Sequence, residues 1–344
     1  MTDIHIRKQG RAGRITLTRP RALNALTYDM CMAIEAALDE WRDDDAVSLV
    51  LLDAEGDKAF CAGGDIAEIY RQGKAGDFDT GRRFWRDEYR MNAKLAEYAK
   101  PIVSFLNGFV MGGGVGLGGH VSHRVVGESA QIAMPECGIG FVPDVGGSLL
   151  LSRAPGRLGV YLGLTAARMG PADALHANFA DVFLPEEKWE GIKTELADTG
   201  DLEALEEDGY PLPESPLAAA QPEIDRLFAA GDLAGIATAL EGAEGELAAR
   251  ARKAVGRNSP LSMAVTLEML RRLRAEADPD IRTALRQEYR VSHRIASEGD
   301  FLEGVRAQII DKDRDPHWRL ALDEVTPETV AAMLAPLGED ELAL

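Results

Sequence analysis

The stretch Met111-Gly-Gly-Gly-Val-Gly-Leu-Gly-Gly119 follows a predicted strand at residues 102–105 and enters a predicted helix. A second glycine turn, Phe60-Cys-Ala-Gly-Gly-Asp65, follows a predicted strand at residues 47–52. Glycine permits positive φ and close approach of a ligand, and the first N–H groups of a helix favour negative charge. Together, the two turns are suited to hold one oxyanion. The alternative is that these glycines only make tight turns.

A dinucleotide site is a second alternative for the same glycines. Gly114, Gly116 and Gly119 satisfy the pattern G-x-G-x-x-G, and Glu136 lies at a suitable distance downstream. The motif lies in the middle of the chain after Asn107, and the first βα turn carries no such fingerprint. We therefore disfavour a dinucleotide site.

The residues before the glycine turns predict a mixed α/β chain. Residues 4–7 and 14–18 alternate apolar and polar around a glycine-containing turn, which indicates a β-hairpin. Thr27 is a predicted N-cap for a helix with one apolar stripe, and residues 47–52 form a buried strand. A further helix is predicted over residues 80–100, ending at Pro101. Before this last helix, the predicted order over residues 4–52 is strand, strand, helix, strand.

Helices dominate the predictions for the C-terminal part of the chain. Strands and helices alternate to about Phe183, after which the sequence turns acidic and alanine-rich, with prolines at 211, 213 and 216. Residues 262–274 and 280–297 have helical spacing. We expect an α/β (α+β) region over residues 1–185 that holds the active site, followed by a mainly helical region over 186–344.

Composition excludes several classes of partner. The 344 residues carry a net charge of −19, with 57 acids and 38 bases, which opposes nucleic-acid binding. No leader pattern opens the sequence, and no apolar run approaches the ~18 residues that span a bilayer. Three cysteines are too few for a disulfide framework. We expect a soluble, cytoplasmic protein without membrane partners.

Two acids lie in an otherwise apolar segment, residues 133–147. Glu136 and Asp144 are its only ionisable acids. An apolar setting raises the pKa of a carboxyl group toward values useful in acid–base catalysis. The alternative is that both acids cap turns beside Pro135 and Pro143.

Other candidate groups are weaker. His120 and His123 have no nearby residues that complete a metal site, so no metal is expected. Cys137 has no convincing histidine partner, which favours a core thiol over a nucleophile. The chain also has no G-x-S-x-G motif of a serine hydrolase.

The turn at residues 60–65, the glycine triplet 112–114 and Pro135-Glu136 resemble, in order and spacing, the crotonase superfamily. The resemblance implies a crotonase-type spiral of ββα units, followed here by a helical C-terminal region. It also implies acyl-coenzyme A (acyl-CoA) thioester substrates, whose thioester oxygen binds between two backbone N–H groups. By motif position, these belong to Gly64 and Gly113.

Departures from the hydratase pattern resemble one branch, the 3-hydroxyisobutyryl-CoA hydrolases. Hydratases of the family carry a second glutamate where this chain has Gly116, and usually a glycine where it has Asp144. The likeness extends to Glu88-Tyr89 and to the stretch from Glu288-Tyr289-Arg290 to Asp311-Lys312-Asp313. Cys137 departs from the small polar residue expected in this branch.

The branch resemblance implies an enzyme that hydrolyses 3-hydroxyisobutyryl-CoA in valine catabolism. Glu136 is the implied main catalytic group, with Asp144 orienting water or the 3-hydroxyl, and Glu88 binding that hydroxyl. The CoA moiety is expected along a set of backbone positions: Ala22, Leu23, Ala62, Gly63, Asp65 and Ile66. No cofactor is expected, because CoA is part of the substrate. A trimer, a hexamer and a monomer are all compatible with the helical stripes.

Two other functions stay open at this point. One is hydration or isomerisation of an enoyl-CoA at the same site, which the absence of a glutamate at Gly116 disfavours. The other is CoA binding without catalysis, which the presence of both Glu136 and Asp144 disfavours.

Overall fold

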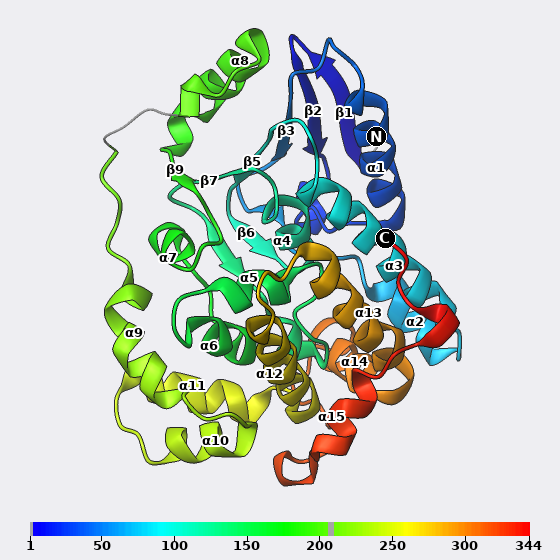
Figure 1. Cartoon of the computed structure of the whole chain (residues 1–344), viewed down its shortest axis with the longest axis vertical. Helices are drawn as coiled ribbons and strands as arrows, with labels where there is room; N and C mark the ends of the chain where they lie inside the picture. Colours follow the sequence, from blue (N-terminus) through cyan, green and yellow to red (C-terminus); the bar gives the residue numbers. More distant parts are fainter. Residues whose placement is uncertain (1–2, 206–209) are drawn as a thin grey trace. The chain divides into compact units, whose positions relative to one another are not determined.

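The computed structural model describes residues 3–205 and 210–344 (Figure 1). The chain divides into two compact units. Unit 1 consists of Met1–Gly64, Arg90–Ala133 and Arg168–Pro216. Unit 2 consists of Asp65–Tyr89, Met134–Ala167 and Leu217–Leu344. Each unit is assembled from three segments of the chain. The expected boundary at residue 185 therefore separates a mixed α/β region from a mainly helical one, and it does not coincide with the division into packed units.

The larger sheet of unit 1 has six strands in the order β1-β2-β3-β5-β7-β9. The first two pair antiparallel, as the predicted hairpin requires, and every later pair is parallel. The strands are β1 (Ile4–Gln9), β2 (Ala12–Leu17), β3 (Leu49–Ala54), β5 (Ile102–Leu106), β7 (His123–Val126) and β9 (Val182–Phe183). Among the described residues, no strand follows β9.

A smaller parallel sheet consists of β4 (Ala59–Cys61), β6 (Phe109–Met111) and β8 (Gln131–Ala133). Along the chain, strands from β3 to β8 alternate between the large and the small sheet. This alternation is the spiral that the family resemblance implies. The residue patterns did not predict the small sheet, because three-residue strands are too short to show a period.

Helix α1 (Tyr28–Arg42) and the end of α3 (Asp79–Ala96) are joined in unit 1 by ion pairs. The Thr27 side chain accepts from the Met30 N–H at 3.2 Å, which confirms the predicted N-cap of α1. Glu35 accepts hydrogen bonds at 2.8 Å from Arg90 and at 3.0 Å from Lys94. Helix α3 ends four residues before the predicted end at residue 100.

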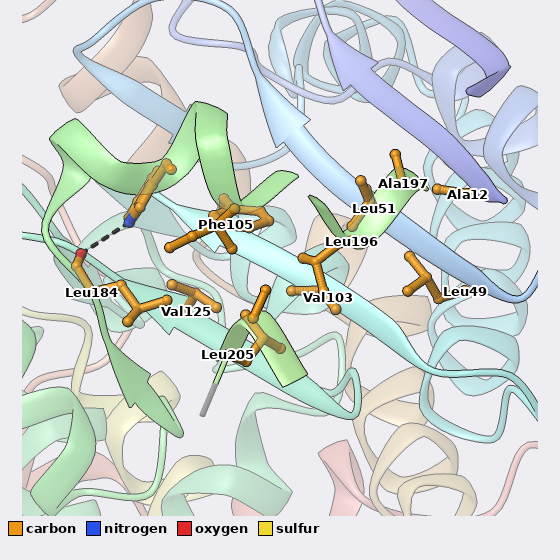
Figure 2. Close-up of a cluster of buried hydrophobic side chains, with 13 residues drawn as sticks. Ala12, Leu49, Leu51, Val103, Phe105, Val125, Leu184, Leu196, Ala197 and Leu205 are labelled. Carbon is orange, nitrogen blue, oxygen red and sulfur yellow. Dashed lines mark hydrogen bonds between the residues drawn. The ribbon is translucent and has the colours of Figure 1, made fainter. Parts of the chain in front are cut away.

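A buried apolar cluster joins the large sheet to α8 (Trp189–Thr199), as Figure 2 shows. Side chains from β3, β5 and β7, such as Leu51, Phe105 and Val125, meet Leu196 of the helix. Trp189 packs edge-on against Phe105 and donates its indole N–H to the Leu184 carbonyl at 2.9 Å. This packing holds α8, the first α-helix after β9, against the large sheet.

The remaining helices divide between the units. Unit 1 also contains α4 (Gly113–Gly118) and α7 (Pro171–His176). Unit 2 is built, within the described residues, from helices and loops. Its helices are α2 (Ala67–Lys74), the part of α3 up to Tyr89, α5 (Gly147–Arg153), α6 (Leu158–Thr165), α9 (Pro216–Leu227, except Pro216), α10 (Leu233–Glu241), α11 (Glu246–Arg257), α12 (Pro260–Ala275), α13 (Ile281–Glu298), α14 (Phe301–Val305) and α15 (Pro327–Met333).

Short helical turns complete the chain: η1 (Pro20–Ala22), η2 (Glu136–Ile139), η3 (Glu186–Lys188), η4 (Glu203–Leu205), η5 (Arg306–Ile310), η6 (Leu322–Glu324) and η7 (Gly338–Asp340). The predicted helices at 262–274 and 280–297 are confirmed by α12 and α13. Within residues 3–205 and 210–344, no helix is long and apolar enough to cross a membrane.

Candidate active site

The two glycine turns lie side by side in unit 1. Strands β4 and β6 pair in parallel, so the turns that follow them leave the small sheet at the same edge. A Cβ on Gly114 would lie 2.1 Å from the Cys61 carbonyl oxygen, which shows how closely α4 packs on the first turn. Gly114, the first glycine of the G-x-G-x-x-G pattern, therefore has a packing role.

Backbone conformation sets the direction of the predicted oxyanion donors. Gly112 precedes α4 at φ 49° and ψ −116°, a conformation that glycine adopts at low cost, and Gly113 begins the helix. Among the described residues, the N–H groups of Gly64 and Gly113 donate to no backbone carbonyl. Free N–H groups of this kind can stabilise negative charge that develops on a carbonyl oxygen.

Several residues predicted to contact CoA meet beside the first turn. The Ala62 N–H donates to the Leu23 carbonyl at 3.0 Å, and the Leu26 N–H donates to the Gly63 carbonyl at 2.9 Å. Ala22, at the end of η1, is exposed. The structure thus brings Ala22, Leu23, Ala62, Gly63 and Gly64 into one part of unit 1. Asp65 and Ile66 belong to unit 2, where Ile66 precedes α2.

Three predicted acids are buried together in unit 2. Glu88 comes from α3, Glu136 begins η2, and Asp144 immediately precedes the turn into α5. Their exposed fractions are 3%, 5% and 6%. Glu88 Oε1 and Glu136 Oε2 have no hydrogen-bond partner among the described residues. Buried carboxyl oxygens without partners are costly, and such costs are typical of catalytic sites.

Burial raises the pKa of all three acids, and the charge of Asp144 acts on the other two. For Glu88 and Glu136, burial is the larger cause, and the charge of Asp144 raises each pKa further. Burial raises the pKa of Asp144 to about 7, although a hydrogen bond from Tyr89 opposes the shift. A carboxyl group with a pKa near neutrality can give and take protons at physiological pH.

Two further polar groups support this cluster, and the residue patterns assigned them no role. The Tyr89 hydroxyl donates to Asp144 Oδ2 at 2.7 Å. Glu288 of α13 is fully buried and accepts hydrogen bonds from Gly146 and Ser148. Helical spacing places both residues on buried faces, but it does not reveal partners that lie 55 and more than 130 residues away.

Cys137 does not have the properties of a nucleophile. It is fully buried, and its thiol lies 3.4 Å from the Thr266 hydroxyl. Burial raises the pKa of the Cys137 thiol to about 12, so the thiolate is disfavoured. In the described ranges, no group of three or more His, Cys, Asp or Glu side chains could hold a metal ion.

The fold and the site define a crotonase-type enzyme, and this chain belongs to the enoyl-CoA hydratase/isomerase family. The sequence profile of that family matches residues 12–334. The family predicted from the glycine turns and Pro135-Glu136 is therefore confirmed, and so is the crotonase-type fold.

Individual relatives of this chain carry the name of one hydrolase. The chain is 37% identical to the mitochondrial 3-hydroxyisobutyryl-CoA hydrolase of Danio rerio, covering 100% of this chain and 92% of that protein. Identity to the protein of the same name from Homo sapiens is 35%, with coverages of 99% and 90%.

Solved structures agree in fold over the whole chain. A structure from Rhodobacter sphaeroides, described as an enoyl-CoA hydratase, is 55% identical with a TM-score of 0.96, covering 100% of each chain. Another from Mycobacterium thermoresistibile, described as a carnitinyl-CoA dehydratase, is 42% identical with a TM-score of 0.94, covering 100% and 99%.

Proposed function

We propose that this chain hydrolyses acyl-CoA thioesters, converting 3-hydroxyisobutyryl-CoA and water to 3-hydroxyisobutyrate and CoA. The buried acids of unit 2 carry the proposal, because hydrolysis needs a nucleophile or a general base at the acyl carbon and a carboxylate can serve as either. Among the described residues, Glu136 Oε2 has no hydrogen-bond partner. Full-length relatives named 3-hydroxyisobutyryl-CoA hydrolase support it. A role in valine catabolism follows from this substrate.

In the proposed reaction, the N–H groups of Gly64 and Gly113 stabilise the negative charge on the thioester oxygen. Glu136 either attacks the carbonyl carbon, forming a mixed anhydride that water then hydrolyses, or removes a proton from the attacking water. In both routes the C–S bond breaks, and CoA leaves as a thiol after gaining a proton. Asp144 orients the water or the substrate's 3-hydroxyl, and Glu88 binds that hydroxyl.

The CoA moiety is proposed to contact the backbone at six positions: Ala22, Leu23, Ala62, Gly63, Asp65 and Ile66. We propose a cytoplasmic location, although the curated relatives are named mitochondrial. Cell fractionation with an antibody tests this location. Light scattering tests whether the protein is a monomer, a trimer or a hexamer.

Hydration of an enoyl-CoA is the second candidate function. Hydration is favoured by the 55% identical structure from Rhodobacter sphaeroides, because that structure is described as an enoyl-CoA hydratase. The residue at the position of the second hydratase glutamate opposes it, because Gly116 lies buried in α4 and carries no ionisable group. The two reactions consume different substrates and release different products, so one experiment separates them.

The test follows thiol release and enoyl absorbance in parallel, with 3-hydroxyisobutyryl-CoA, 3-hydroxypropionyl-CoA and crotonyl-CoA. We expect thiol release from the hydroxyacyl thioesters, and a loss of ~100 to 10,000-fold in kcat for Glu136→Gln. Glu35→Gln is the matched control, because Glu35 is also buried but is bound by Arg90 and Lys94 in unit 1. Loss of the enoyl signal without thiol release would assign the chain to the hydratases instead.

A further inference from the structure

The turn after Asp144 has an unusual backbone. Val145 has φ 52° and Gly146 has φ 82°. A β-branched residue reaches positive φ only where its surroundings hold it there, and such residues concentrate at active sites. The Gly147 N–H closes the turn by donating to the Asp144 carbonyl at 2.6 Å. Because Asp144 is the first residue of this turn, the direction of its side chain depends on the turn being held.

Glu288 is the side chain that holds the turn. Its Oε2 accepts the Gly146 N–H at 2.8 Å, and its Oε1 accepts the Ser148 N–H at 3.1 Å and the Ser148 hydroxyl at 2.5 Å. These backbone N–H groups lie at the start of α5, where they lack partners within the helix. Glu288 is 0% exposed, so bulk water cannot replace it as the acceptor.

The same helix, α13, also supports the tyrosine that holds the Asp144 carboxyl group. Tyr289, the neighbour of Glu288, packs edge-on against Tyr89 with ring centroids 6.2 Å apart. Tyr89 in turn donates its hydroxyl to Asp144 Oδ2. One helix therefore contributes to fixing both the backbone that follows Asp144 and the hydrogen-bond donor to its carboxyl group.

We propose that Glu288 is a positioning residue for thioester hydrolysis, which acts by fixing the Val145–Gly146 turn and thereby the orientation of Asp144. This role rests on the proposed function. It assigns no contact between Glu288 and the substrate. A purely structural Glu288 would instead stabilise the fold and leave the turnover of folded enzyme unchanged.

The test compares Glu288→Gln and Ser148→Ala with Glu35→Gln and the wild type, using the full chain and 3-hydroxyisobutyryl-CoA. Glutamine keeps the size of Glu288 but presents an NH₂ group to one of the two backbone N–H groups, so that backbone hydrogen bond is lost. Small misplacements of a reacting group can cost ~100-fold in rate. We expect kcat to fall ~10 to 100-fold in Glu288→Gln with KM changed less than ~3-fold.

Two further readouts separate positioning from stability. The pH at which kcat/KM rises should shift in Glu288→Gln, because the surroundings of the Asp144 carboxyl group change. In Glu35→Gln this pH should stay unchanged. Amide hydrogen exchange of residues 145–149 should accelerate in Glu288→Gln, because the acceptor for Gly146 or Ser148 is lost. Ser148→Ala removes only the hydroxyl, so a smaller fall in kcat is expected, and this variant carries the test if Glu288→Gln does not fold.

The outcomes distinguish this inference from the proposed function. Folded Glu288→Gln with wild-type kcat and pH profile would overturn the positioning role while hydrolysis stands. Wild-type enzyme that releases no thiol would overturn the proposed function and the catalytic role of Glu288 with it. Unchanged exchange at residues 145–149 would overturn the claim that Glu288 holds the turn, whatever the activity.

Discussion

Replacing Tyr89 with phenylalanine should move the pH dependence of the enzyme. The Tyr89 hydroxyl donates to Asp144 Oδ2 at 2.7 Å, and this bond stabilises the ionised carboxylate. Phenylalanine keeps the ring that packs against Tyr289 and removes the hydroxyl, which also has a hydrogen bond with the Ser292 side chain. Because the charged form loses its partner, the pKa of Asp144 should rise from about 7.

The size of the shift follows from the hydrogen bond. A bond to a charged group contributes ~1.5 to 3 kcal/mol. At ~1.4 kcal/mol per pKa unit, its loss raises the pKa of Asp144 by roughly one to two units. At pH 7, the ionised fraction of Asp144 then falls from roughly one half to between about 1% and 10%. If catalysis uses ionised Asp144, kcat/KM at pH 7 falls by roughly 5 to 50-fold and recovers at higher pH.

The assay is thiol release from 3-hydroxyisobutyryl-CoA between pH 5.5 and 9.5, with kcat/KM fitted at each pH. Tyr98→Phe is the matched control, because the Tyr98 hydroxyl also donates a hydrogen bond, but to the Leu38 carbonyl at 2.7 Å in unit 1. A Tyr89→Phe profile that superposes on the wild-type profile would refute the assigned link between Tyr89, Asp144 and catalysis.

Two further predictions concern stability and the glycine turns. The pKa of Asp144 is raised from 3.8 to about 7, so its contribution to the free energy of unfolding is lost as pH rises from about 4 to 7. In denaturant titrations, Asp144→Asn should therefore show a shallower decline over this window, by up to ~1.4 kcal/mol per pH unit; equal slopes would contradict the raised pKa. Gly114→Ala places a Cβ 2.1 Å from the Cys61 carbonyl oxygen, so it should lower the melting temperature and reduce kcat ~100-fold or more. Gly191→Ala, which meets open space in α8, should do neither, and a Gly114→Ala enzyme with wild-type kcat would contradict the role of the turn.

Local patterns predicted the parts of this structure that local physics determines. The Thr27 cap, the β1–β2 hairpin and helices α12 and α13 each depend on neighbouring residues, and each is confirmed. The short strands β4, β6 and β8 depend instead on pairing with one another. A three-residue strand carries no pattern that predicts its partner, so only the family resemblance implied the small sheet.

The candidate site shows the same limit. Glu136 and Asp144 were identifiable because charged residues are rare in an apolar segment, and both are buried. Tyr89 and Glu288 were not, because each is one polar residue on a long amphipathic helix, where a solvated position is the usual interpretation. Their roles depend on contacts across 55 and 142 residues. Such contacts form only when the chain has folded.

The descriptions of the relatives disagree about the reaction, and the arrangement of acids gives a physical reason to prefer hydrolysis. Identity of 55% to a structure described as a hydratase is counted over all residues, and a shared fold does not by itself determine the reaction. The reaction depends on a few ionisable groups. Gly116 supplies none from α4, whereas Glu88, Glu136 and Asp144 concentrate three buried carboxyl groups in unit 2. Burial raises the pKa of each of these carboxyl groups. Burying them costs folding free energy, and this cost brings no benefit unless the carboxyl groups transfer protons in the reaction. The acids present, more than the overall identity, therefore favour attack on the thioester carbonyl.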